Sequence, residues 1–159
     1  MNDTEVVARS SGRTGRAQPL RRIAVTGIVA TLAAMVATAV AAVLARAIGV
    51  DFEVPEGGET IPVTGVAVVT GFFSLVGTVI AVALLRWSAR PAERFVWTAV
   101  SLTAVSLVPP FLSGADAATT AALLGLHLLA ATVMIPTLTR SLRVIAQRSE
   151  HLTGSIDAE

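Results

Sequence analysis

Four long stretches of the chain contain no Asp, Glu, Lys or Arg, and they set its hydrophobic pattern. They cover residues 23–45, 60–85, 95–115 and 117–139. Each stretch is apolar around the whole circumference of a helix, without a polar stripe at the helical period. An α-helix rises about 1.5 Å per residue, so each stretch can cross the roughly 30 Å of hydrocarbon in a bilayer. We therefore predict an all-α protein, a four-helix transmembrane bundle with spans at about 23–48, 62–85, 95–112 and 117–139.

The composition favours lipid over water as the surrounding solvent. Charged residues make up 14% of the 159 residues, against about 25% in ordinary soluble domains. A chain of this length cannot hide so much apolar surface in a core of its own. A soluble bundle of four buried helices is disfavoured, because such helices still need a polar face. The absence of cysteine also excludes a disulfide-rich secreted module.

Arginine is confined almost entirely to one side of the predicted bundle. Eleven of the twelve basic residues, all of them Arg, lie in the two tails or between spans two and three: Arg9, Arg13, Arg16, Arg21, Arg22, Arg86, Arg90, Arg94, Arg140, Arg143 and Arg148. Cytoplasmic segments of membrane proteins are rich in Lys and Arg, so we predict an N-in/C-in orientation in a bacterial plasma membrane. Trp87, Phe95 and Trp97 fall on the same side, where an aromatic belt is expected.

The two tails are predicted separately from the spans. Residues 1–22, rich in Ser, Gly and Arg, are expected to form a disordered basic cytoplasmic tail. Residues 140–159 form a second cytoplasmic tail, in which 140–148 extends span four as a helix along the inner leaflet and 153–159 is disordered. Arg21-Arg22 before an apolar run also resembles a signal peptide. That run exceeds the usual length of about 7–15 residues, which favours a retained first span.

The opposite side of the predicted bundle is acidic. Asp51, Glu53, Glu56 and Glu59 lie in the first outer loop, and Asp116 lies in the second. A cation-binding loop is one interpretation, but the spacing of a calcium loop is missing, so a solvated turn is favoured. Arg46 falls at the outer end of span one. We expect it either to reach the interface or to pair with Asp51, Glu53 or Asp116.

Small residues and prolines predict how the spans pack and bend. Small residues recur at helical spacing at Ala30, Ala34, Thr38, Ala42, Thr70, Ser74, Thr78, Ala121 and Gly125. Helices in lipid associate through close backbone approach, so we interpret these positions as packing faces rather than as a substrate path. Pro109 and Pro110 should kink or end span three near Val108, leaving 109–114 as the outer mouth. Pro136 should cause a milder kink in span four.

His127 is the most informative polar residue, because it falls near the middle of span four. An ionisable group at that depth is costly and should face the bundle interior. In a tight hairpin of spans three and four, Thr103 and Ser106 reach the same depth, and a hydrogen bond from the imidazole to either hydroxyl is favoured. A proton relay or a ligand contact is left open. Metal or haem ligation is disfavoured, since no Cys, second His or carboxylate lies at that depth.

Patterns typical of enzymes are missing from the chain. It contains no phosphate-binding glycine loop, nucleophile elbow, zinc-protease helix or paired catalytic carboxylates, so no catalytic residue, metal or cofactor is predicted. The basic tail lacks interleaved aromatic residues, which argues against nucleic acid as a partner. The leading hypothesis is a non-enzymatic structural or partner-binding membrane subunit, with the lipid bilayer and a homo-oligomer or membrane protein as partners. The alternative is a small oligomeric transporter or channel protomer using His127, and a membrane-embedded redox enzyme is a weaker third.

Three short motifs support a family resemblance when their order and spacing are taken together. They are residues 54–63 entering span two, Ser106-Leu107-Val108-Pro109 ending span three, and His127 with Ile135-Pro136 and Arg140 in span four. With these motifs the chain resembles a family of small four-span membrane proteins of high-GC Gram-positive bacteria, the domain of unknown function 6069. The resemblance covers roughly residues 20–145. It implies a four-span membrane protein and supplies neither an activity nor a site residue.

Overall fold

The computed structural model describes the backbone of residues 3–54 and 59–156, and the side chains of residues 18–53 and 60–148. Its elements are α1 (Asp3–Ala47), β1 (Glu53–Val54), β2 (Glu59–Thr60), α2 (Val63–Trp87), α3 (Pro91–Ser106), α4 (Val108–Leu112) and α5 (Ala117–Ile156). Four segments are long and apolar enough to cross a bilayer: Gln18–Ala47, Val63–Trp87, Pro91–Leu112 and Ala117–Arg148. The predicted all-α fold with four membrane-length helices is therefore confirmed.

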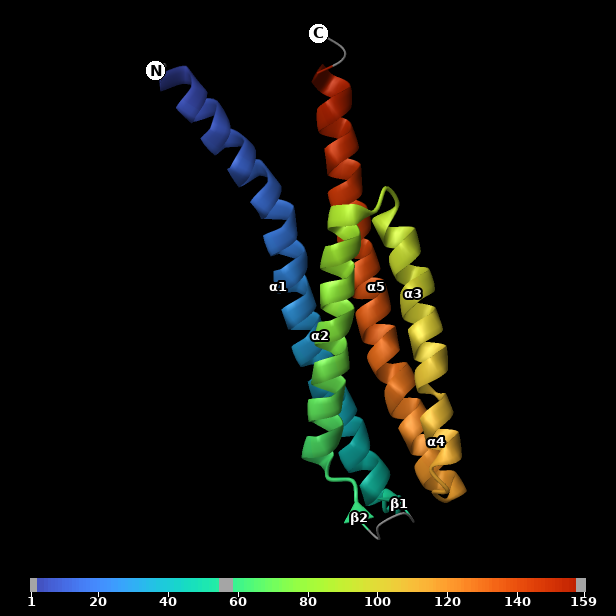
Figure 1. Ribbon diagram of the computed structural model, residues 1–159. Coiled ribbons are helices and arrows are strands. Elements are labelled where there is room, and N and C mark those ends of the chain that lie inside the picture. The colour runs from blue at the N-terminus through green and yellow to red at the C-terminus, as the bar shows by residue number, and fades with distance from the viewer. Residues whose placement is uncertain (1–2, 55–58, 157–159) are drawn as a thin grey trace.

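The helices run side by side along one direction, with both termini at the same end of the molecule (Figure 1). Helices α2 and α5 each pack against both α1 and α3, so α1 and α3 flank this central pair. We call the end that carries residues 86–94 and 140–148 the basic end. The opposite end, with residues 48–62 and 113–116, is the hairpin end. Figure 1 also shows α1 leaning away from the other helices toward its N-terminus.

The α1–α2 interface depends on residues too small to keep the two helices apart. A Cβ on Gly27 would overlap the side chain of Thr78, and a Cβ on Gly71 would lie 2.8 Å from Sδ of Met35. Just beyond the Gly71–Met35 contact, on the side away from Gly27, Thr38 Oγ1 donates a hydrogen bond to Thr70 Oγ1 at 3.3 Å. This combination of close approach and an interhelical hydrogen bond is what holds helices together where lipid surrounds them.

The outward surface of the helices is apolar along the spans. Large hydrophobic side chains with high exposure include Val36, Val40, Val69, Phe72, Phe73, Val79, Val105 and Phe111. Monomeric soluble proteins rarely expose apolar patches beyond a few hundred Å². A surface of this kind fits a hydrocarbon surrounding.

The tails differ from their predicted structure. Residues 3–22, expected to be disordered, continue α1 without a break, and residues 153–156 continue α5. Propagating an existing helix avoids the unfavourable nucleation step, and Arg and Ala are good helix formers, so a polar tail can extend a span as helix. The predicted helical extension over 140–148 is confirmed, although it continues the direction of α5 (Figure 1). Residues 157–159 lie outside the described part.

Prolines interrupt the third span at the predicted place. Helix α3 ends at Ser106, and the separate short helix α4 begins at Val108. Neither Pro109 nor Pro110 has a backbone N–H to continue the ladder. The expected irregular outer mouth over 109–114 is wrong in part, because Val108–Leu112 is helical: proline fits the first turn of a new helix. Pro136 lies inside α5, which stays one helix through it.

A small hairpin closes the connection between α1 and α2. Strand β1 pairs with β2 in antiparallel register, with Glu53 opposite Thr60. Phe52, which precedes the hairpin, has a φ of 52° and is 1% exposed, and it packs with Ala42 and Leu126. A bulky residue in the left-handed region is strained, and the burial of its ring stabilises that conformation. Asp51 and Glu53 are exposed, as expected of a solvated turn, and Phe52 between them is buried. Glu56 lies outside the described residues.

Candidate functional site

His127 is half-buried on α5, about a quarter of the way along that helix. Its Nδ1 lies 3.1 Å from the carbonyl oxygen of Leu123, one turn earlier. A carbonyl oxygen only accepts, so Nδ1 carries the hydrogen, and in the neutral ring Nε2 is left as an acceptor. The ring is therefore positioned by its own helix.

The expected hydrogen bond from His127 to span three is wrong. Ser106 Oγ donates to the carbonyl oxygen of Thr103 at 2.8 Å, within α3. In the part of the chain whose side chains are described, no hydrogen bond joins His127 to Thr103 or Ser106. Hydroxyl and imidazole groups on a helix can reach the carbonyl three or four residues back, and this local bond competes with a partner on another helix. No three His, Asp or Glu side chains gather as a metal site among the described residues.

Arg46 joins the end of α1 to the segment that enters α2. Its Nη2 donates to the carbonyl oxygen of Ile61 at 2.7 Å, and its guanidinium carbon lies 5.9 Å from the centre of the Phe52 ring. The Ile61 N–H in turn donates to the Phe52 carbonyl at 3.1 Å. Of the two roles expected for Arg46, pairing with Asp51, Glu53 or Asp116 is not found among the described side chains. The guanidinium instead satisfies a backbone carbonyl and stacks on an aromatic ring.

Asp116 caps the N-terminus of α5. Its Oδ1 accepts from the backbone N–H of Thr119 at 2.8 Å, and its Oδ2 accepts from the Thr119 hydroxyl at 3.0 Å. These two hydrogen bonds lower the pKa of the Asp116 carboxyl below its ordinary value. Both oxygens of the carboxylate thus bond the first turn of α5, where a negative charge also complements the helix dipole.

Two buried hydroxyls in the α1 and α5 spans have no hydrogen-bond partner in the part of the chain that the structure describes. They are Thr31 Oγ1 and Thr139 Oγ1, each on a residue less than a tenth exposed. Sequence reasoning missed both, because helical spacing alone does not separate a threonine that bonds its own backbone from one that does not.

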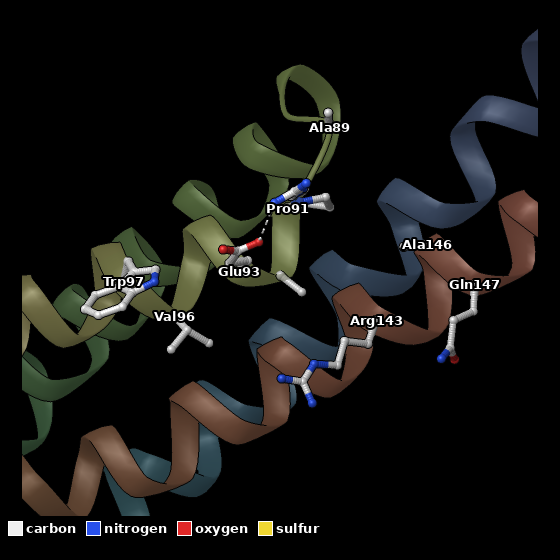
Figure 2. Close-up of a pocket in the computed structure, with 10 residues that line it drawn as sticks. Ala89, Pro91, Glu93, Val96, Trp97, Arg143, Ala146 and Gln147 are labelled. Atoms are coloured by element: carbon white, nitrogen blue, oxygen red, sulfur yellow. Dashed lines mark ion pairs between the residues drawn. The ribbon is translucent and has the colours of Figure 1, made fainter.

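A groove at the basic end was also missed from the sequence. It has a volume of about 410 Å³ and lies between the start of α3 and the C-terminal part of α5. Its polar lining includes Arg90, Glu93, Trp97, Arg143 and Gln147. Figure 2 shows that Arg143 comes from α5, whereas Val96 and Glu93 come from α3 on the other side of the groove. The sequence shows arginines before α3 and in the C-terminal part of α5, but only the fold shows that these two segments lie side by side and form a groove.

Arg90 and Glu93 form an ion pair at the mouth of this groove. Arg90 Nη1 lies 3.6 Å from Glu93 Oε2, and both side chains are largely exposed (Figure 2). Exposed pairs of this kind contribute little to stability, about 0–1 kcal/mol. Arg143 makes no hydrogen bond or ion pair with any described residue. In this groove, the Arg90 guanidinium is held only by a weak ion pair, and the Arg143 guanidinium has no partner among the described residues.

Comparison with known proteins gives one family and no characterised relative. The model of a family of unknown function (DUF6069) matches residues 18–144. No curated protein and no solved structure matches the chain. The matched range begins at the first apolar span and ends within α5, so it contains the first three spans, most of the fourth and both connections at the hairpin end.

Proposed function

The chain belongs to a family of unknown function (DUF6069), and from its own residues we propose that it is a non-enzymatic, multi-pass protein of the bacterial plasma membrane. Its role is that of a structural or partner-binding subunit. The partners are the lipid bilayer and either further copies of the chain or another membrane protein. Nucleic acid is not among them.

One observation carries this proposal: His127 and two of the buried hydroxyls within the spans bond to carbonyls of their own helices. Thr38 donates to Ala34 at 2.9 Å, Thr78 to Ser74 at 3.0 Å, and His127 to Leu123 at 3.1 Å. Groups bonded in this way stabilise a packed interior and are not held ready for a substrate. The apolar outward surface adds the means to contact another helix in lipid.

The subunit role is tested by the mass of the protein particle in mild detergent. We expect the full chain, purified from its native membrane, to run as a particle heavier than its 16.4 kDa monomer. If the chain expressed alone gives the same mass, the partner is a second copy; if only the native preparation is heavier, the partner is another protein. A monomer in both preparations would contradict the proposal.

An N-in/C-in orientation is part of the proposal. The basic end carries both termini, and the hairpin end carries Asp51, Glu53 and Asp116 (Figure 1). The positive-inside rule favours the basic end in the cytoplasm.

A second candidate function is a small oligomeric transporter or channel protomer, and one feature of His127 favours it. Its Nε2 has no hydrogen-bond partner among the described residues, so this nitrogen can accept a hydrogen bond from a transported group. The test is proton flux into vesicles that contain the purified chain and a pH-sensitive dye. Flux that disappears in His127→Ala would support this candidate; flux equal to that of empty vesicles would exclude proton transport through His127.

A further inference from the structure

The groove at the basic end lies where lipid headgroups meet the protein. On α5, the apolar run ends at Thr139, and Arg143 follows one turn later. On α3, Trp97 is 70% exposed within the first two turns. Tryptophan is enriched at the boundary between hydrocarbon and headgroups. The lining residues therefore span the boundary, with the tryptophan toward the hydrocarbon and the arginines toward the headgroups.

The charge of this region selects an anion. A second groove of about 600 Å³ adjoins the first, shares Arg90, Glu93 and Trp97 with it, and adds Arg94. Together the two grooves hold Arg90, Arg94 and Arg143 against one carboxylate, Glu93, which leaves an excess of two positive charges. Guanidinium groups bind phosphate oxygens through paired, charge-assisted hydrogen bonds.

The surface beside the groove distinguishes a lipid from a free phosphate ion. Val96 lines the groove, and one helical turn further along α3 the exposed side chain of Val100 continues an apolar path toward the hydrocarbon. An acyl chain can follow this path while the headgroup stays at the arginines. Inorganic phosphate would gain nothing from it.

We propose that this groove binds the phosphodiester headgroup of an anionic phospholipid, with Arg143 and Arg90 contacting the phosphate and Trp97 packing against the glycerol and upper acyl region. Basic pockets between membrane helices bind anionic headgroups in this way. Arg90 exchanges its weak ion pair with Glu93 for the phosphate. The site rests on the proposed membrane location but on neither the sidedness nor the subunit role. If the chain stays in the supernatant after centrifugation of a lysate without detergent, the membrane location itself is disproved. The binding assay below tests the groove alone.

The test is native mass spectrometry of the full chain in detergent, titrated with phosphatidylglycerol or with phosphatidylcholine. We expect phosphatidylglycerol to bind more tightly, and Arg143→Ala to weaken it about tenfold, since one charge-assisted contact to phosphate is lost. The matched control is Arg148→Ala, which removes the same charge from an exposed position of α5 outside the groove. It should change binding less than twofold.

Several outcomes would overturn the proposal. Equal loss in Arg143→Ala and Arg148→Ala would mean that net charge alone attracts the lipid. Equal binding of the two lipids would mean that the headgroup charge is not recognised. Displacement of phosphatidylglycerol by millimolar inorganic phosphate would assign the groove to the free ion. Arg143→Lys keeps the charge and loses the planar fork, and we expect it to bind with intermediate affinity; its circular dichroism spectrum checks that the fold is intact.

Discussion

At the scale of single residues, a few small or hydrogen-bonded side chains decide how closely the helices pack. Gly27 lies against Thr78, and Gly71 lies against Met35. Because hydrocarbon gives the helices no hydrophobic reason to associate, the free energy of assembly depends on such contacts and on satisfied polar groups. The effect of a substitution at such a position on the stability of the bundle should therefore depend on which atoms the changed side chain meets.

Gly27→Ala is expected to destabilise the bundle. The added Cβ would overlap the Thr78 side chain, and overpacking of this kind costs about 1–3 kcal/mol. Gly77→Ala is the control, since its Cβ would meet no atom within 4 Å. The measurement is thermal unfolding in detergent, with a lower midpoint for Gly27→Ala only. Adding Thr78→Ala to Gly27→Ala should restore part of the loss; if it restores none, the Gly27–Thr78 contact is not the cause.

Thr31→Val and Thr38→Val should have different effects although both remove one hydroxyl from α1. Thr31 Oγ1 has no partner, so an apolar group of the same shape leaves stability unchanged or raises it. Thr38 Oγ1 bonds Ala34 and Thr70, and its loss leaves the Thr70 hydroxyl without this partner, at a cost of about 1 kcal/mol. Unfolding in mixed micelles compares the two variants directly. Equal destabilisation would show that Thr31 has a partner.

The cap at Asp116 should make the start of α5 sensitive to acid. The pKa of its carboxyl is lowered in the folded chain, so its hydrogen bonds stabilise the helix above the ordinary value of 3.8 and are lost as the pH falls through the folded pKa. Amide hydrogen exchange at Thr119 and Thr120 should speed up, relative to amides in the middle of α5, between pH 5 and the lowest pH tolerated. Asp116→Asn keeps a capping oxygen without the titration and should lose this pH dependence. If the exchange rate of these two amides, divided by that of amides in the middle of α5, stays constant with pH in the wild-type chain, the role of Asp116 is contradicted.

Local competition explains why the residue-scale predictions were only partly right. His127 lies within a helix of membrane length, as expected, yet its partner is a carbonyl of its own helix. Arg46 lies near the end of α1 at the hairpin end, yet it bonds the Ile61 carbonyl rather than a carboxylate. In both cases the sequence indicates the depth of the group but not the rotamer or the neighbouring backbone, and these choose between partners that differ by about a kcal/mol.

At the scale of elements, the length of the charge-free runs predicts the four spans well. It does not predict that α1 and α5 continue as helices into the tails. The four runs without charge correspond to the four membrane-length helices. Composition alone predicts disordered tails, because it takes no account of the neighbouring helix, which removes the nucleation cost. The β1–β2 hairpin was missed because two-residue strands have no periodicity to detect. Its anchor, Phe52, depends on contacts with Ala42 and Leu126 that only the fold creates.

The break between α3 and α4 gives a prediction at this scale. In Pro109→Ala with Pro110→Ala, the new N–H groups can donate to the carbonyls of Val105 and Ser106, so the third span should become one continuous helix. Hydrogen exchange at Leu107 should then slow by at least tenfold, as a tenfold change corresponds to about 1.4 kcal/mol. Pro62→Ala is the control, because Pro62 precedes α2 and interrupts no ladder. Unchanged exchange at Leu107 would place the cause of the break outside the two prolines.

At the scale of the whole molecule, charge divides the bundle into two ends of opposite sign. The basic end combines three segments distant in sequence: the region before the first span, the α2–α3 connection and the C-terminal part of α5 (Figure 1). The hairpin end combines the α1–α2 hairpin with the Asp116 cap. Each end then has its own chemistry, with arginines facing anionic lipid at one and local capping and stacking at the other. The proposed sidedness and the proposed lipid site both derive from this division.

Cysteine labelling tests this division, because the chain has no native cysteine to interfere. Ala117→Cys places an exposed thiol at the hairpin end, and Ala89→Cys places one at the basic end. We expect a membrane-impermeant maleimide to label Ala117→Cys in intact spheroplasts and Ala89→Cys only after permeabilisation. The reverse pattern would contradict the N-in/C-in orientation, and labelling of both from outside would contradict an odd number of spans between them. Replacing Arg86, Arg90 and Arg94 by Gln should leave part of the Ala117→Cys molecules protected, because in the proposed orientation these arginines favour a cytoplasmic connection.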